Sequence, residues 1–344
     1  MENVKCITEM CCIDVTYGCN FRCKHCYNSS GEHNFGSKEL SDEELLNLID
    51  ELIVLNPRVL CFCGGETLTR KDIILKMAKR FTDATKSQCN MVSNGFFITE
   101  EVAKEIKDSG IKLVQISLDG ATAETHNWLR NNSQSFDKAI NALKILKKAG
   151  LSTSVACTPT KKNIHEINDL IDLCLTLGVT DFRMQPLMKM GRANGIDDYF
   201  LNDYEYFKLH RLLIKRGSEI NKNILNIEWG DPLQHLTNYA DGQNRFNMIA
   251  IGAYGDLTIS PYLPIVIGNI RRHSLKDYIE NNFANVLQNE FVVKVCKLLQ
   301  NSKEMNINNV SKLPPVFSGK DIVLDVFDED LESLGDSLIK KYQL

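Results

Sequence analysis

Apolar positions recur in two alternating patterns between residues 40 and 180. Amphipathic stretches bounded by capping residues and glycines predict helices that begin at Ser41, run from Thr99 to Gly110 and from Ser135 to Gly150, and cover His165 to Leu177. Short, partly β-branched apolar runs predict strands near 13–16, 58–62, 88–92, 111–118, 151–156 and 179–184. The pattern is therefore a repeat of strand–helix units.

Strands separated by helices pair in parallel through right-handed crossovers, because a tight hairpin cannot connect them. Such units build either an open doubly wound sheet or a barrel, and in both the reactive groups gather at the carboxyl ends of the strands. We expect an α/β fold in which residues 1–198 form a partial (β/α)6 TIM-like barrel.

The pattern changes after about residue 200. A helix is predicted over 202–222, short strands with glycine and proline turns over 249–270, and a helix over 275–300. We expect a small α+β extension over 199–310. The acidic tail over 311–344 is either a solvated end or a lid for the barrel mouth.

Charge and hydropathy indicate which partners and which cellular compartments the protein is expected to have. Its 40 basic and 44 acidic side chains give a net charge of −4, which provides no general attraction to nucleic acid. No apolar run approaches the ~20 residues of a membrane span, and no basic and apolar signal segment opens the chain. We therefore expect a cytoplasmic protein without nucleic-acid or membrane partners.

Cysteine is the unusual component, with 12 residues in a chain without an export signal. Cys19, Cys23 and Cys26 follow the first predicted strand in a C-x3-C-x2-C spacing. A zinc ion would need a fourth ligand, such as His25 or a distant cysteine, although His25 is expected to face solvent. A 4Fe-4S cluster held by three thiolates leaves one iron open, and the lack of a second C-x2-C knuckle favours it.

These cysteines, followed by the aromatic Tyr27, resemble the signature of the radical S-adenosylmethionine (radical SAM) enzymes. Gly64-Gly65-Glu66, after the second strand, resembles the family motif that receives the methionine amino group. Ser93-Asn94-Gly95 is similar to the family's Thr-Asn-Gly. The resemblance implies that these residues bind S-adenosylmethionine (SAM).

The fourth strand carries a stretch that resembles the peptide- and protein-modifying branch of that superfamily, in which Ser-Leu-Asp-Gly precedes a histidine and an arginine. The resemblance implies that Ser117 and Arg130 contact the SAM carboxylate and that Asp119 or its neighbours contact the ribose. Asn163 and Gln185 match polar positions after the fifth and sixth strands.

The extension resembles the SPASM/twitch module of that branch but is degenerate, because only Cys296 follows Cys174. An auxiliary cluster needs three or four thiolates, so we predict one 4Fe-4S cluster and a cluster-free extension. Because Cys19 comes so early, we expect no leader-binding domain before it. A peptide substrate would then be recognised by the extension, the tail or a separate leader-binding protein.

The other cysteines have simpler interpretations. Cys61 and Cys63 alternate along a strand and are typical of packing, and Cys11 and Cys12 receive no role. Cys157 ends the fifth strand, where a thiol would be a hydrogen donor to a substrate radical or a packing residue. In the extension, the candidates for substrate contact or rim packing are Trp229, Asp231, Tyr254 and Tyr262.

The resemblance implies reductive cleavage of SAM to methionine and a 5′-deoxyadenosyl radical that abstracts hydrogen from a substrate. An external electron donor, such as flavodoxin or ferredoxin, would supply the electron. The leading substrate is a ribosomally synthesised peptide that is cross-linked, epimerised or oxidised. The alternatives are a small molecule, such as a sugar, tetrapyrrole or cofactor precursor, and an iron–sulfur scaffold or regulatory protein without turnover.

Overall fold

The computed structural model describes residues 9–33, 38–241, 248–298, 313–328 and 330–344. Its strands join one 11-stranded sheet in the order β11-β10-β9-β8-β1-β2-β3-β4-β5-β6-β7. The strands are β1 (Met10–Asp14), β2 (Val59–Cys63), β3 (Gln88–Ser93), β4 (Leu113–Ser117), β5 (Ser152–Cys157), β6 (Asp181–Met184), β7 (Asn226–Trp229), β8 (Met248–Ile251), β9 (Asp256–Thr258), β10 (Ile265–Asn269) and β11 (Ile322–Val323).

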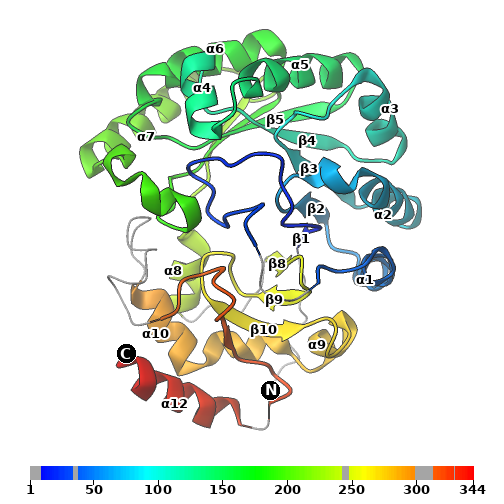
Figure 1. The fold of residues 1–344 in the computed structure, drawn as a ribbon, viewed down its shortest axis with the longest axis vertical. Helices are drawn as coiled ribbons and strands as arrows, with labels where there is room; N and C mark the ends of the chain where they lie inside the picture. The colour runs from blue at the N-terminus through cyan, green and yellow to red at the C-terminus, as the bar shows by residue number, and fades with distance from the viewer. Residues whose placement is uncertain (1–8, 34–37, 242–247, 299–312, 329) are drawn as a thin grey trace.

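Strands β1 to β7 pair in parallel, and helices lie along the outside of this curved part of the sheet (Figure 1). The helices are α1 (Asp42–Leu55), α2 (Lys71–Ala84), α3 (Glu100–Asp108), α4 (Ala123–Arg130), α5 (Ser135–Lys148) and α6 (Ile167–Leu177). The sheet is not closed, because β7 and β11 end it. The predicted α/β fold with a partial barrel is confirmed, as are the strands expected in its first half.

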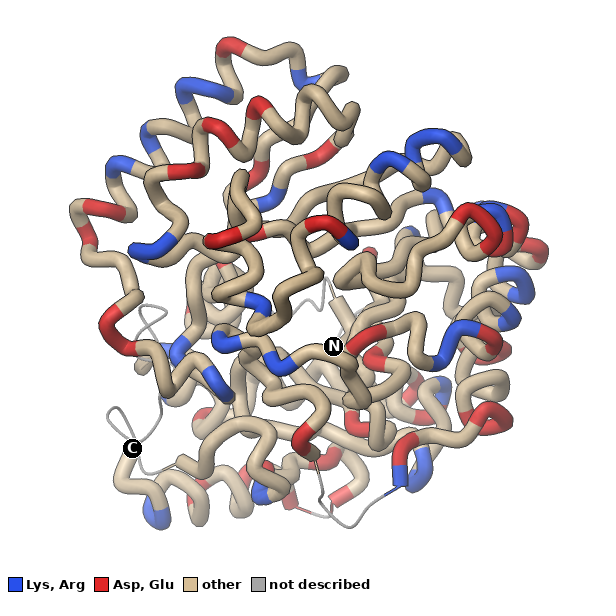
Figure 2. Tube along the Cα trace, turned by 45° about the horizontal axis from the view of Figure 1, so that its top comes forward, with Lys and Arg blue, Asp and Glu red and all other residues tan. Residues whose placement is uncertain are grey.

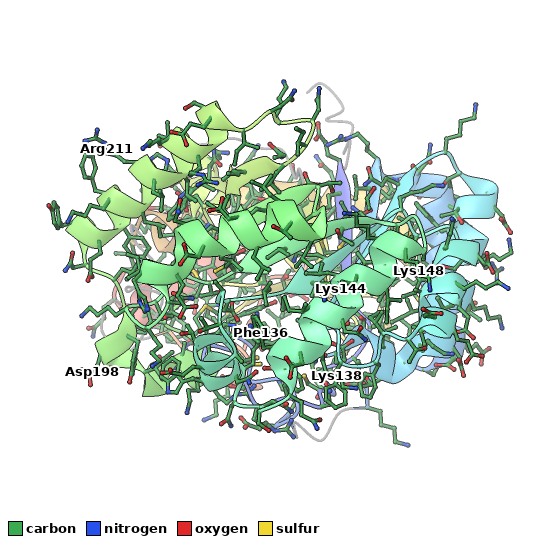
Figure 3. All side chains as sticks on the ribbon, turned by 90° about the horizontal axis from the view of Figure 1, so that it is seen from above. Phe136, Lys138, Lys144, Lys148, Asp198 and Arg211 are labelled. Carbon is green, nitrogen blue, oxygen red and sulfur yellow. The ribbon has the colours of Figure 1, made fainter. Side chains whose placement is uncertain are left out.

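Local sequence signals set the helix ends. The Ser41 side chain accepts a hydrogen bond from the Glu44 backbone N–H and the Thr99 side chain one from Val102, so α1 and α3 begin where predicted. Gly178 ends α6 in the left-handed conformation, with φ 71°. Helix α5 turns Leu143 inward and Lys144 outward (Figure 3), which anchors it to the sheet by its apolar face.

The extension continues the barrel sheet. Strand β8 pairs in parallel with β1, and β9 and β10 follow as antiparallel partners. Helix α7 (Asp203–Glu219) agrees with the predicted 202–222 helix and leads to β7, a four-residue strand that the sequence pattern did not reveal. Helix α8 (Gln234–Ala240) then leads toward β8.

The prediction of one helix over 275–300 is wrong. The chain there forms α9 (Leu275–Glu280), the 3-10 helix η5 (Phe283–Gln288) and α10 (Glu290–Leu298). Asn282 adopts a left-handed backbone with φ 51°, and this interrupts the helix between α9 and η5. Residues 299–300 lie outside the described part of the chain.

The tail is packed rather than solvated over residues 313–328. Leu313, Ile322 and Leu324 are buried, and β11 adds to the edge of β10. The buried Asp325 carboxylate accepts a hydrogen bond of 2.9 Å from the Tyr278 hydroxyl. The expectation of a solvated end therefore fails for this segment, and α12 (Leu331–Tyr342) follows it.

Basic and acidic residues are interspersed along the chain trace (Figure 2). Among the described residues, no helix is both long and apolar enough to cross a bilayer.

Candidate active site

A cavity of about 1180 Å³ is lined by the carboxyl ends of the barrel strands, the cysteine loop after β1 and parts of the extension. The predicted site residues on its wall are Cys19, Cys23, Cys26, Tyr27, Gly64, Gly65, Asn94, Ser117, Arg130, Cys157 and Gln185. The side chains of Glu66, Asp119 and Asn163 lie behind this wall instead. The structure thus gathers the motifs of six strands, β1 to β6, around one cavity.

The two glycines after β2 bring the cysteine loop against that strand. The Gly65 N–H donates to the Thr16 carbonyl at 2.7 Å, and the Glu66 N–H donates to the Gly18 carbonyl at 2.9 Å. A Cβ at Gly64 would lie 2.3 Å from the Thr16 oxygen, and one at Gly65 would lie 2.1 Å from the Gly18 oxygen. Only glycine permits this approach, which closes the wall beside the cysteines.

A second anchor of the cysteine loop comes from the chain after β6. The Arg192 guanidinium donates to the Cys23 carbonyl at 2.8 Å, and its backbone N–H donates to the Cys26 carbonyl at 3.0 Å. Gly191 has φ 53°, and a Cβ there would lie 2.5 Å from the Cys26 oxygen. No role for Arg192 could be predicted from its sequence neighbourhood, because this contact spans 169 positions.

The three thiols line the cavity but do not form a site for a single metal ion. Within the described part of the chain, no three His, Cys, Asp or Glu side chains lie close enough to hold a single metal ion. A zinc site needs such convergence, whereas a four-iron cluster separates its ligands. Burial raises the pKa of Cys19, and that of Cys23 to about 11, so a bound cationic centre would be needed to keep both as thiolates.

His25 points inward, so the expectation that it faces solvent is wrong. Its side chain is 10% exposed and lines the cavity between Cys23 and Cys26. Burial lowers its pKa to about 4, which leaves a neutral imidazole at neutral pH. Its buried Nδ1 has no hydrogen-bond partner among the described residues. A buried nitrogen without a hydrogen-bond partner beside three thiols is what we expect where the wall contacts a bound metal centre or ligand.

The Glu66 carboxylate is turned away from the cavity. It accepts hydrogen bonds from the Ser93 hydroxyl at 2.8 Å, the Asn94 N–H at 2.8 Å and the Leu68 N–H at 3.1 Å. These bonds fix the end of β3 and place Asn94 on the cavity wall. In this structure the Glu66 side chain therefore supports the end of β3, and Gly64 and Gly65 supply the cavity wall beside it.

Asp119 and Arg130 form a buried ion pair at the end of β4. Their Oδ2 and Nε atoms are 2.6 Å apart, and the side chains are 0% and 11% exposed. Burial opposes the charge of Asp119, but the Arg130 guanidinium, His25, His126 and the Thr158 N–H together outweigh it and lower the carboxyl pKa. Asp119 also accepts from the Thr158 N–H at 3.0 Å. The pair therefore aims a fixed positive charge at the cavity beside Cys23.

Asn163 connects the chain after β4 to the chain after β5, and its side chain lies outside the cavity wall. Its Nδ2 donates to the Asp119 carbonyl at 2.7 Å and to the Thr158 carbonyl at 2.8 Å. Because Asn163 is fully buried and off the cavity wall, its direct effect is on the β4 and β5 loops.

Another part of the cavity wall is formed by aromatic side chains. Gln185 Nε2 donates to the Tyr262 hydroxyl at 2.6 Å, and the Tyr27 ring lies 5.8 Å from that of Tyr262 and 5.7 Å from that of Phe317. Phe317 lines the cavity, which places part of the tail at the site. Cys157 is 2% exposed, and burial raises its pKa, so it carries its proton at neutral pH.

Of the four extension residues expected to contact substrate or the rim, Asp231, Tyr254 and Tyr262 line the cavity. Trp229 does not, and its ring packs 6.1 Å from that of Tyr206.

The open α/β barrel, with its cysteine loop and glycine turn at one cavity, is the arrangement that the resemblance to radical SAM enzymes predicts. Residues 13–174 match the family model of the radical SAM superfamily. The chain is 27% identical to an AdoMet-dependent heme synthase of Methanosarcina barkeri over 78% of its own length and 81% of that protein. It is 31% identical to the mycofactocin maturase MftC of Mycolicibacterium smegmatis over 60% of its length and 52% of that protein.

Solved structures agree in fold. The structure of Streptococcus suis SuiB bound to S-adenosylmethionine superposes with a TM-score of 0.68 at 13% identity, covering 87% of this chain and 76% of SuiB. Residues 13–174 thus form a radical SAM domain, and the relatives of this chain are enzymes that include both peptide maturases and heme synthases. That family uses an iron–sulfur cluster and SAM. The chain spans about half the length of the maturase it matches.

Proposed function

We propose that the cavity holds one 4Fe-4S cluster on Cys19, Cys23 and Cys26, with SAM bound beside it. The observation that carries the proposal is the meeting of these thiols with Gly64–Gly65 and Arg130 on one wall. The unpartnered His25 Nδ1 and the thiols' need for a cationic centre support it.

Together the bound groups would supply a 5′-deoxyadenosyl radical that abstracts hydrogen from a substrate carbon. The residues of the chain bind and orient. Arg130, held by Asp119, presents its guanidinium to a carboxylate, which is its usual partner. The backbone at Gly64–Gly65 faces the ammonium group, and Asn94 and Ser117 complete the polar wall. The aromatic rings of Tyr27 and Phe317 exclude water from the mouth.

The proposed substrate is a ribosomally synthesised peptide. Mycofactocin maturase MftC is a relative, and SuiB has been solved bound to its precursor peptide SuiA. The cavity exceeds the ~300–1,000 Å³ typical of small-ligand pockets, which leaves room for a peptide side chain beside SAM.

The test is anaerobic incubation of the reduced, reconstituted protein with peptides encoded near it. Deoxyadenosine together with a change in peptide mass or chirality is expected. Deoxyadenosine without any peptide change would contradict the peptide substrate and leave the radical chemistry standing.

A tetrapyrrole or another small molecule is the second candidate, because the heme synthase match covers 81% of that protein. Candidates carrying deuterium at the reacting carbon distinguish the two: transfer into deoxyadenosine from a labelled porphyrin favours the small molecule. Transfer from a labelled peptide favours the maturase.

Two partners follow from this proposal. An external flavodoxin- or ferredoxin-type donor supplies the electron, and a separate protein binds the peptide leader. Pull-down with a tagged leader peptide, with and without the candidate leader-binding protein, tests the second partner. Direct capture by this chain alone would contradict it.

A further inference from the structure

Three thiols outside the cysteine loop meet on the same cavity wall. Cys12 on β1 pairs in register with Cys61 on β2, so both side chains leave the same face of the sheet. Cys63 follows on that face, with its Sγ 3.6 Å from the Cys61 Sγ. All three line the cavity, whereas their buried neighbours Cys11 and Leu60 do not. The interpretation of Cys61 and Cys63 as packing residues does not account for this placement.

The three thiols differ in acidity. Cys63 Sγ donates to Cys61 Sγ at 3.6 Å, and Cys12 Sγ donates to Met248 Sδ at 3.8 Å. Interactions with Cys61 and Cys63 and the Arg183 charge lower the pKa of Cys12 well below its usual value, whereas the pKa values of Cys61 and Cys63 are raised. Cys12 is therefore the most acidic thiol of the group.

These sulfurs do not form a single-ion metal site, because no three of the described metal-ligating side chains approach closely enough to hold one ion. Their position suits a reaction inside the cavity. Cys63 immediately precedes Gly64, and both line the cavity together with Tyr27 and the cysteine loop. The thiols thus lie close to where the proposed radical would form.

We propose that Cys61 and Cys63 are hydrogen-atom donors to carbon-centred radicals in this cavity, with the neighbouring Cys12 sulfur stabilising the sulfur radical left behind. This inference rests on the proposed function. The chemical reason is that an S–H bond is weaker than an aliphatic C–H bond, so transfer to carbon is downhill.

The carbon radical takes the hydrogen atom of Cys63, which forms a C–H bond and leaves a thiyl radical. The thiyl shares its odd electron with the Cys12 sulfur in a three-electron S–S bond, and the Cys12 proton passes to water. One electron from an external flavin or iron–sulfur carrier separates the two sulfurs as thiolates, and two protons from water restore both S–H groups.

The first experiment needs no cofactor. Diamide takes two thiol hydrogens to become a hydrazine and leaves a disulfide. We expect tandem mass spectrometry of the oxidised, cofactor-free protein to show a disulfide between Cys12 and either Cys61 or Cys63. Separate alkylation of these thiols after oxidation would show that they are not adjacent and would overturn the inference.

The second experiment uses the reconstituted protein with SAM and reductant in D₂O, without substrate. Thiols exchange to S–D, so the deoxyadenosyl radical should collect deuterium from Cys61 or Cys63. The combined variant Cys12→Ala, Cys61→Ala, Cys63→Ala is expected to lose this deuterium, and Cys63→Ser alone to reduce it. The control is Cys89→Ala, because Cys89 is buried on β3 and does not line the cavity.

The possible outcomes distinguish a failure of the thiol donors from a failure of the proposed radical chemistry. Deuterium that persists in the combined variant, or that disappears only in Cys157→Ser, would overturn the inference. If deoxyadenosine never forms, the proposed function itself fails and the inference falls with it. Deoxyadenosine formed without deuterium in the wild type refutes the thiol donors alone. The iron content of each variant, measured in parallel, shows that the fold is retained.

Discussion

Replacing Asp119 by asparagine tests the site's electrostatics, because it removes one charge and keeps the side-chain shape. The Arg130 guanidinium, 11% exposed, would lose its partner at 2.6 Å and remain beside the Cys23 sulfur. The Thr158 N–H can still donate to the amide oxygen. The change therefore isolates the ion pair.

The expected loss of stability follows from the burial of the ion pair. Asp119 is 0% exposed, so water cannot replace it as the partner of Arg130. Breaking a buried pair by removing one partner costs about 3–5 kcal/mol of stability. The double variant Asp119→Asn, Arg130→Gln removes the stranded charge and should recover part of this loss.

Urea unfolding of the cofactor-free protein is the assay, with the midpoint compared at constant slope. The matched control is Glu100→Gln, which breaks a 2.7 Å pair with Lys148 whose side chains are 71% and 74% exposed. The control should change the midpoint little.

The stabilisation that Asp119 provides should be lost in acid. The folded-state pKa of Asp119 lies below the ordinary value of 3.8, so its contribution is complete above 3.8 and is lost as pH falls below it. The gap between wild type and variant should be constant near neutrality and shrink below pH 3.8. A gap no larger than that of the control, or one that grows in acid, would refute the reasoning.

Two further predictions concern the supports of the cysteine loop and the cavity wall. Gly191→Ala should reduce iron uptake on reconstitution, because its Cβ would lie 2.5 Å from the Cys26 oxygen; Gly217→Ala, with nothing within 4 Å, is the control, and equal uptake by both would contradict this role. Glu66→Gln should destabilise the fold by about 1–3 kcal/mol, because the amide N–H₂ meets backbone donors, and should weaken SAM binding measured by calorimetry. Unchanged affinity would show that Asn94 is not positioned through Glu66.

Features encoded locally could be predicted from the sequence. The capping box at Ser41 and the glycine stop at Gly178 depend on neighbours within a turn, and both occur where expected. The cysteine spacing and the glycines after β2 are likewise contiguous, so their arrival at one cavity follows from parallel strands alone.

Features that depend on distant partners could not be predicted in this way. The Arg192 guanidinium reaches the Cys23 carbonyl across 169 positions. Glu39 anchors the start of the cysteine loop by accepting from the Tyr17 N–H at 2.7 Å, and nothing in its own neighbourhood signals that role. The inward direction of His25 and the side chain of Glu66 behind the wall were missed for the same reason: a motif gives residue identity but not side-chain direction.

Short length and acidic composition explain two other differences between the predicted and the observed structure. Strand β7 has four residues, too few for periodicity to show, and its pairing with β6 supplies the missing stability. The acidic composition of the tail concealed Leu313, Ile322 and Leu324, which pack it against the extension.

The most direct test compares the anaerobically reconstituted wild type with the variant in which Cys19, Cys23 and Cys26 are all alanine. Iron, sulfide and deoxyadenosine are measured after SAM and reductant are added. The wild type should contain about four irons and about four sulfides per chain and should release deoxyadenosine, and the variant should show none of these. SAM cleavage retained by the variant would contradict the account.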